Sequence, residues 1–198
     1  MKSLTPDDLY SLEHYARIRP DFRRQVMAHK QGRRLALGPH MTMVFEDRLT
    51  VQYQVQEMLR VERIFEPEAI ADELAAYNPL IPDGSNLKAT LFLEYESIEE
   101  RTQELRRLVG IEHQVWLRVG TRAPLWGVAD PDLERSTAEK TSAVHFLRFD
   151  LPAIDLEAAR AGAPLAVGIE DPRYPERVDP LPARLAQALR SDLEVPGS

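Results

Sequence analysis

Two glutamates and two histidines are the side chains whose type and placement suggest chemistry in this chain. Glu62 lies in a stretch, residues 47–65, without glycine or proline. The apolar residues of this stretch recur at helical spacing and form one stripe with Glu62: Val51, Val55, Met58 and Phe65. A buried carboxylate must be paired, protonated, bound to a metal or turned into a cavity. We therefore expect Glu62 to form a core ion pair, with Arg60, Arg118 or Arg148, or to be a ligand in a pocket.

The two histidines share this expectation of burial. Alternation along residues 142–149 places His145 on the same side of a strand as Leu147 and Phe149. His113 begins another strand, in phase with Val115 and Leu117, so it too is expected to point inward. A histidine on an apolar face is either a core residue with its hydrogen bonds satisfied or a ligand.

A metal site is one way to combine these residues. Histidine and glutamate are ligands of many non-haem iron, manganese and zinc sites, so Glu62, His113, His145 and Glu57 are candidate ligands of a divalent metal. No His-Glu-x-x-His or Glu-x-x-His motif supports them. The chain has no cysteine, which excludes disulfides, thiolate nucleophiles and an iron-sulfur cluster of its own.

A long polar loop is the second candidate region. Residues 130–142 contain no glycine and connect two predicted strands. Arg135, Ser136 and Lys140 of this loop are candidates for binding an anion or a nucleotide. The glycines of a phosphate-binding loop are missing, as are a nucleophile elbow and a dinucleotide fingerprint. The residues therefore leave catalysis undecided.

Charge is unevenly distributed along the chain. The formal net charge of −7 argues against nucleic acid as a partner, yet residues 17–34 hold seven basic side chains and one acidic. Such a stretch either docks an acidic partner or anion, or is a solvated helical face. No apolar run is long enough to span a membrane, and the first residues lack the features of a signal peptide, so we expect a cytoplasmic protein without membrane contact.

The predicted elements change in type near residue 82. Helices are predicted over about 5–18, 21–30, 47–65, 67–77, 97–109 and 182–193, with Pro20 separating the first two. An extended segment with a bend covers 34–45, and strands are predicted over 87–95, 113–119, 125–129, 142–149 and 165–169. Residues 171–180 are predicted to be a surface loop. Several strands follow one another too closely for crossover helices, so they should pair antiparallel.

These elements predict an α+β fold, with amino-terminal helices packed on a mostly antiparallel sheet of about five strands. A chain of 198 residues is long enough for one core, so we expect a single domain over residues 1–198. Within it, residues 1–81 are a mainly helical layer and residues 82–198 contain the sheet.

Several longer strings carry a family resemblance. They are QVQEMLR at 54–60, YNPLIP at 77–82, EERT at 99–102, GIEHQVWLRV at 110–119, DLERST at 132–137 and KTSAVHFLRF at 140–149. With these strings the chain resembles the uncharacterised bacterial domain-of-unknown-function family 3501 over nearly its whole length. The resemblance implies a setting in redox or oxidative-stress metabolism, because genes of the family tend to lie beside those of a rubrerythrin-like protein and an iron-sulfur oxidoreductase. It supplies no catalytic residues.

Three functional hypotheses follow. The first is a cytoplasmic accessory or interaction protein whose basic amino-terminal region and polar loop bind a rubrerythrin-like or iron-sulfur partner. The second is a metal-binding protein or enzyme with a pocket of histidine and glutamate. The third is an anion or nucleotide binder. The oligomeric state, including a homo-oligomer, stays open.

Overall fold

The computed structural model describes residues 1–129 and 140–194. Its helices are α1 (Leu12–Gln31), α2 (Arg48–Glu62), α3 (Pro67–Tyr77), α4 (Ile98–Arg107), α5 (Ala153–Arg160) and α6 (Ala183–Asp192), with short 3-10 helices η1 (Pro6–Asp8), η2 (Asn78–Leu80) and η3 (Ile111–Gln114). Its strands are β1 (Arg34–Leu37), β2 (Met41–Phe45), β3 (Asn86–Leu93), β4 (Val115–Val119), β5 (Leu125–Trp126), β6 (Val128–Ala129), β7 (Val144–Asp150), β8 (Leu165–Ile169) and β9 (Arg177–Val178).

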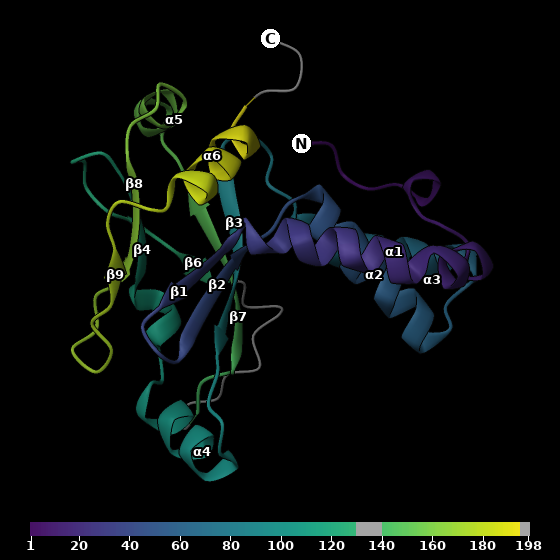
Figure 1. Ribbon diagram of the computed structural model, residues 1–198, viewed down its shortest axis with the longest axis horizontal. Coiled ribbons are helices and arrows are strands. Elements are labelled where there is room, and N and C mark those ends of the chain that lie inside the picture. Colours follow the sequence, from purple (N-terminus) through teal and green to yellow (C-terminus); the bar gives the residue numbers. More distant parts are fainter. Residues whose placement is uncertain (130–139, 195–198) are drawn as a thin grey trace.

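The strands form two antiparallel sheets, which confirms the α+β class and the antiparallel pairing. One sheet has the order β1-β2-β3-β7-β6 and the other β5-β4-β8-β9, so the described strands make a sheet of five and a sheet of four. Figure 1 shows the sheets side by side, with α5 and α6 near one end and α4 at the other. The sequence predicted one sheet of about five strands and did not reveal the division into two.

Alternation along the strands decides which side chains fill the space between the sheets. Leu87, Leu91 and Leu93 of β3 are buried on one side, and they share one core with Leu147 and Phe149 of β7. Buried residues of β4 and β8, such as Leu117 and Val167, belong to the same core. The core thus lies between the sheets and is stabilised by removal of apolar surface from water. We call this part the sandwich.

Gly127 divides the predicted strand 125–129 into two strands that belong to different sheets. β5 pairs with β4, whereas β6 pairs with β7. A Cβ atom at Gly127 would lie 3.1 Å from the ring of Phe149 and 3.3 Å from the carbonyl oxygen of Val115. A residue without a side chain therefore lets the chain pass closely from one sheet to the other.

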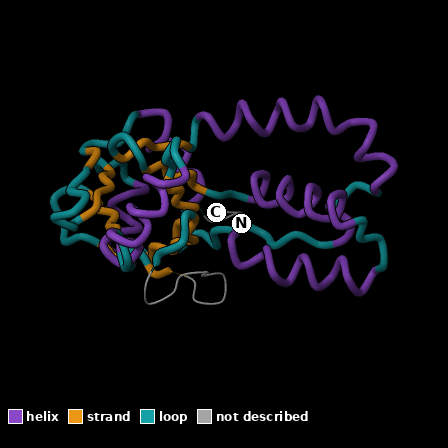
Figure 2. The backbone as a smooth tube through the Cα atoms, turned by 90° about the horizontal axis from the view of Figure 1, so that it is seen from below, coloured by secondary structure: helices purple, strands orange, loops and turns teal. Residues whose placement is uncertain are grey.

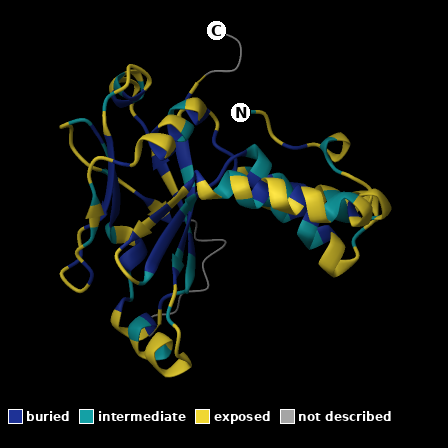
Figure 3. Ribbon diagram, viewed as in Figure 1, coloured by how far each residue is buried: buried dark blue, intermediate teal, exposed yellow. Residues whose placement is uncertain are grey.

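Helices α1, α2 and α3 form an arm that extends away from the sandwich (Figures 1 and 2). We call these three helices the helical arm. The arm has apolar clusters of its own, one around Tyr15, Phe22 and Val26 of α1 and another around Val55 and Leu59 of α2. Figure 3 shows exposed residues along the outer side of α1 and buried ones toward the other helices. The arm is therefore held together by its internal faces.

The predicted break at Pro20 is wrong, because α1 continues through it. An interior proline removes one backbone hydrogen bond and costs roughly 3 kcal/mol. Pro20 and Ala16, whose carbonyl loses its amide donor, are both exposed, so water reaches that carbonyl. Burial of Tyr15 and Phe22, on either side of the proline, holds the helix together. Packing against α2 thus outweighs the local signal.

The carboxyl-terminal part of the chain contains two short elements that the sequence did not reveal. α5 follows Pro152, and β9 pairs with β8 inside the stretch predicted to be a surface loop. β9 has only two residues, which is too short for alternation to be visible. Within the described residues no helix is both long and apolar enough to cross a membrane.

Candidate functional site

Glu62 is exposed, so the prediction that it is buried in a core ion pair is wrong. The buried residues of α2 are Val51, Val55 and Leu59, together with Gln56. The helix ends at Glu62, and Arg63 follows in the left-handed conformation with a φ of 55°. The sequence-based stripe continued the helix to Phe65, which is 69% exposed. Glu62 therefore continues the stripe in direction, but it lies at the very end of the helix and is exposed there.

Glu57 joins two helices of the arm. Its carboxylate accepts hydrogen bonds of 2.8 Å from both Nε and Nη2 of Arg19 and from the hydroxyl of Tyr15, all on α1. Arg60 donates to it at 3.3 Å. The hydrogen bonds from Arg19 are the main reason that the pKa of Glu57 falls to about 2. A carboxylate with so many donors is a structural link between α1 and α2.

His145 is buried, as predicted, and lies in a cluster with Glu112 and Thr141. Nε2 of His145 lies 2.9 Å from the carbonyl oxygen of Ser142 and 3.0 Å from the Thr141 hydroxyl. The Thr141 hydroxyl donates to Glu112 at 3.1 Å, and the Glu112 carboxylate lies 3.8 Å from Nε2 of His145. A carbonyl only accepts hydrogen bonds, so this geometry places a proton on Nε2. That nitrogen is therefore a donor in this arrangement and does not present a lone pair to a metal.

His113 is not inward-facing, which corrects the prediction. It lies in η3, just before β4, and its side chain is 60% exposed at a distance of 3.8 Å from the carboxylate of Glu112. The alternation of β4 begins only at Val115, so the predicted strand was two residues too long at its start. Sequence reasoning missed Glu112, which lies between both histidines.

The four candidate metal ligands do not come together. Glu57 and Glu62 belong to α2 in the helical arm, whereas His113 and His145 belong to the sandwich. Over residues 1–129 and 140–194, no group of three histidine, aspartate or glutamate side chains has an arrangement that could hold a metal ion. Uptake of a divalent metal by this chain stays a prediction.

The candidate anion site lies mostly outside the described part of the chain. Arg135 and Ser136 are among residues 130–139, which the structure does not describe. Lys140 is described and exposed. The hypothesis of an anion site in this loop therefore remains a prediction.

The basic stretch 17–34 is largely balanced by acidic side chains of the same chain. Its ion pairs are Arg17 with Glu13 at 3.5 Å, Arg19 with Glu57 at 2.8 Å, Arg24 with Asp21 at 2.8 Å and Arg34 with Glu94 at 3.3 Å. Arg33 is buried and contacts Asp47 and Asp192. These pairs reduce the charge that the stretch can offer to an acidic partner.

A buried polar cluster at the base of the arm was not foreseen. Asp47 caps α2 through Thr50, and the neighbouring Glu46, only 2% exposed, accepts from the hydroxyls of Thr50 and Thr90 at 2.5 and 2.6 Å. Arg33 lies beside them at the end of α1. The sequence signal for this cluster is the pair Glu46 and Asp47 between β2 and α2, because aspartate is a favoured residue at the start of a helix. The cluster fixes the direction in which the arm leaves the sandwich.

The far end of the arm presents apolar side chains to solvent. Tyr10, Val61 and Phe65 are 36%, 59% and 69% exposed. A hollow of about 250 Å³ lies here, lined by Pro6, Leu9, Tyr10, Ser11, Leu12, Leu59, Ile64, Phe65 and Ile70. We call the lining residues, together with Val61, the arm tip. Clustered exposed apolar residues of this kind mark interaction sites more often than isolated ones do.

The arm tip is held in place by hydrogen bonds to α2. The side-chain amide of Gln56, which is fully buried, accepts from the backbone N–H of Tyr10 at 2.6 Å and donates to its carbonyl at 3.3 Å. Gln52 donates to the carbonyl of Asp8 at 2.6 Å, and Arg48 pairs with the Asp8 carboxylate at 2.6 Å. The amino-terminal segment is thus fastened along α2, so the hollow is formed before anything enters it.

Comparisons with known proteins agree with the resemblance carried by the sequence. The family described as "Protein of unknown function (DUF3501)" matches residues 3–193. A crystal structure described as a novel protein of unknown function from Burkholderia pseudomallei K96243 is 50% identical, with a TM-score of 0.90, and the match covers 98% of this chain and 100% of that chain. No curated protein matches the chain. The similarity therefore extends over both the helical arm and the sandwich.

Proposed function

The chain belongs to the DUF3501 family, and from that premise we propose that it is an accessory protein that binds a partner protein through its arm tip. The family resemblance implies a partner of the rubrerythrin-like or iron-sulfur oxidoreductase type, in redox or oxidative-stress metabolism. The protein then contributes binding and positioning, while the redox centres belong to its partners.

The observation that carries the proposal is the exposure of Phe65 and Val61 at the end of the projecting helical arm. Phe65 is 69% exposed beside a preformed hollow, and burying one large apolar side chain contributes roughly 1.5–3 kcal/mol. Aromatic side chains at the centre of an interface often dominate its binding energy. The hydrogen bonds of Gln56 and Gln52 already order the amino-terminal segment of the arm tip. Binding a partner therefore costs this segment little conformational entropy.

Charges around the tip fit the rim of a protein interface. Glu62 and Arg63 are exposed next to Phe65, and Arg60 is partly exposed beside Glu57. An apolar centre surrounded by side chains of both signs is the usual anatomy of a non-obligate protein interface. This surface replaces the basic stretch 17–34 as the docking region in our proposal, since most of the arginines in that stretch are paired with acidic side chains of the same chain.

The test uses the purified proteins. The rubrerythrin-like protein and the iron-sulfur oxidoreductase encoded in the same host are each titrated against the wild-type chain, Phe65→Ser and Ile154→Ser. Ile154 is a matched control, because it is also a large apolar residue, 56% exposed, but lies on α5 in the sandwich. We expect wild type and Ile154→Ser to bind one of the two proteins equally, and Phe65→Ser to bind at least tenfold more weakly.

Two results would overturn the proposal. One is that neither purified protein binds the wild-type chain at micromolar concentration. The other is that Phe65→Ser and Ile154→Ser bind equally well. Light scattering of the free chain completes the test, because a dimer that Phe65→Ser separates would assign the arm tip to a second copy of this chain and not to a partner.

A further inference from the structure

The hollow of the arm tip is bordered by exposed carboxylates. Asp7, Glu62 and Glu66 are exposed, and each is next in sequence to a residue of the arm tip. Within the described part of the chain, none of these three carboxylates forms an ion pair. Arg63 is also exposed and adds a positive charge. The apolar surface of the tip thus has an acidic border with a cation in it.

Helix α3 extends this acidic border. It contains no basic side chain and three acidic ones: Glu68, Asp72 and Glu73. Glu73 follows Ile70, which lines the hollow, by three residues, so helical geometry places both side chains on one face of α3. The carboxylates outnumber the cations at the tip even when Arg60, which is paired with Glu57, is counted with Arg63. Basic groups are therefore attracted to the surroundings of the hollow.

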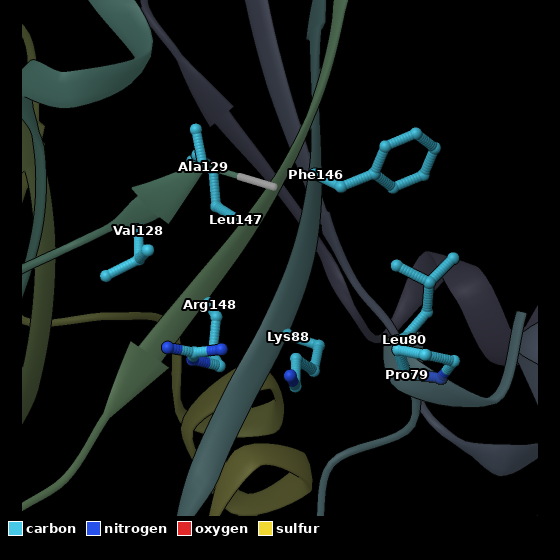
Figure 4. Close-up of a pocket in the computed structure, with 8 residues that line it drawn as sticks. All are labelled: Pro79, Leu80, Lys88, Val128, Ala129, Phe146, Leu147 and Arg148. Carbon is cyan, nitrogen blue, oxygen red and sulfur yellow. The ribbon is translucent and has the colours of Figure 1, made fainter. Parts of the chain in front are cut away.

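A second apolar hollow of this chain has the opposite charge. It lies between η2, β3, β6 and β7 and has a volume of about 150 Å³. Lys88 and Arg148 lie there between Val128 and Leu80 (Figure 4). Both cations already have interaction partners, which for Arg148 is Asp150 at 2.9 Å. A basic segment is therefore favoured at the arm tip and not at this second hollow.

The size of the arm-tip hollow suits side chains of a larger partner. Its volume of about 250 Å³ lies below the range of about 300–1,000 Å³ that is usual for small-molecule pockets. It exceeds the roughly 150 Å³ in which an engineered cavity of another protein holds benzene. The hollow therefore has room for one or two apolar side chains.

Backbone groups beside the hollow already have partners. The N–H and the carbonyl of Tyr10 are both bonded to the Gln56 amide. The N–H of Ile64 donates to the carbonyl of Leu59 at 2.9 Å, and the described part of the arm tip contains no strand. An extended segment would find no strand edge here to pair with its own backbone. An α-helix satisfies its backbone internally, so a helix fits this surface.

We propose that the arm tip binds an amphipathic helix that has apolar side chains on one face and lysines or arginines beside them. This inference rests on the proposed function, and it specifies the chemistry of the segment through which a partner docks. One or two apolar side chains of the helix enter the hollow between Leu59, Ile64 and Ile70. The cations of the helix lie beside Glu62 and Glu66, where they add specificity and speed of association.

Selection from a random peptide library tests this inference without knowledge of the partner. Phage that display random peptides of about sixteen residues are selected on the immobilised wild-type chain and depleted on Phe65→Ser. We expect the enriched peptides to be basic, with apolar residues at positions i, i+3 or i+4, and i+7. The inference is overturned if no peptide is enriched, or if the enriched peptides are neutral, acidic or without helical spacing.

Charge variants test the acidic border with one enriched peptide, labelled and followed by fluorescence anisotropy. Glu62→Lys and Glu66→Lys should each weaken binding about fivefold, and raising the salt from about 50 mM to about 500 mM should remove most of that difference. Glu99→Lys should change nothing. Glu99 is a matched control, because it is an exposed acid next to the exposed apolar Ile98 but lies on α4. Equal binding by all three variants would overturn the inference.

The same variants separate this inference from the proposed function. If a redox protein binds the wild-type chain, loses affinity for Phe65→Ser and binds Glu62→Lys and Glu66→Lys unchanged, the arm tip docks a partner but not through a basic helix. That result overturns the inference and leaves the proposed function standing. If basic helical peptides bind at the tip while neither redox protein does, the inference holds and the proposed partners are wrong.

Discussion

Arg33, at the end of α1, and Asp192, at the end of α6, form an ion pair although 159 residues separate them in the sequence. Both side chains are only 4% exposed. Arg33 also donates to the carbonyl oxygen of Phe45 at 2.9 Å and lies 3.2 Å from Asp47, the cap of α2. One guanidinium thus ties together the helical arm, the five-stranded sheet and the carboxyl-terminal helix.

Replacing Arg33 should be strongly destabilising. Arg33→Met leaves Asp192 buried without its cation and removes one of the basic partners of Asp47, and breaking a buried pair costs about 3–5 kcal/mol. Arg23→Met is the control, because Arg23 is an exposed arginine on the nearby helix α1. Urea unfolding at pH 7 measures both. A loss below about 1 kcal/mol for Arg33→Met would show that the cluster does not anchor the arm.

The stability of the protein should depend on pH through Asp192. Burial raises the pKa of its carboxyl from 3.8 to about 6 in the folded state, so the folded protein holds this proton more tightly than the unfolded chain. The stabilisation is complete below about pH 4 and is lost as the pH rises through 6. Asp192→Asn cannot titrate. The stability of wild type relative to Asp192→Asn should therefore fall by roughly 3 kcal/mol between pH 4 and pH 7.

Urea unfolding at several pH values between 4 and 7 measures this difference. His29, whose Nε2 lies 2.5 Å from Asp47, faces the same cluster and is present in both proteins, so the comparison isolates the change at Asp192. A difference between the two proteins that stays constant over this range would contradict the assignment to Asp192.

Glu57 should have the opposite dependence. Arg19 lowers the pKa of Glu57 from 4.5 to about 2, so the stabilisation is present above pH 4.5 and lost as the pH falls through 2. Both side chains are partly exposed, at 33% for Arg19 and 21% for Glu57, and solvent screening reduces the effect. Glu57→Gln should lose about 1–2 kcal/mol at pH 7 and almost nothing near pH 2. If Glu57→Gln loses the same stability at both pH values, the charge of the Glu57 carboxylate is not the cause of the loss.

Thr141 should matter through its hydroxyl. It is 1% exposed and donates to the buried Glu112, so Thr141→Val removes a donor while keeping the shape. An unsatisfied buried acceptor costs about 1–3 kcal/mol. Thr102→Val on α4 is the matched control, because Thr102 is only partly buried and donates to a backbone carbonyl of its own helix. Thermal unfolding should separate the two variants, and equal losses would contradict the role of Glu112.

Glu62 should tolerate replacement. Because it is exposed at the end of α2, Glu62→Ala should change the free energy of unfolding by no more than about 0.5 kcal/mol. Val55→Ala, in the buried stripe of the same helix, should cost about 2 kcal/mol. Chemical unfolding of both variants measures these losses. A large loss of unfolding free energy in Glu62→Ala would instead support the burial of Glu62 that the sequence predicted.

Local patterns predicted most of the elements, because helical spacing, strand alternation and caps act over a few residues. The inward face of β3 and the burial of His145 followed from alternation alone. The error at Glu62 has the same origin: spacing indicates a face only as far as the helix extends, and the left-handed Arg63 ends it. Sequence reasoning continued the stripe to Phe65, beyond that end.

Relationships between distant segments were not predictable from one sequence. Nothing near Arg33 indicates that Asp192 is its partner, and the passage of the chain between two sheets depends on the fit of Gly127 against Phe149. Pro20 shows the converse, since tertiary packing of α1 overrides a strong local signal. The arm tip likewise exists only because the amino-terminal segment folds back along α2.

Hydrogen exchange of the backbone amides, with and without the purified rubrerythrin-like or iron-sulfur protein, tests the arm-tip proposal most directly. Binding at the arm tip predicts slower exchange at residues 9–12 and 59–66, with β4 and β8 of the sandwich unchanged and the protection absent in Phe65→Ser. Unchanged exchange at the tip on saturation with a bound partner, or protection confined to the sandwich, would contradict the proposal.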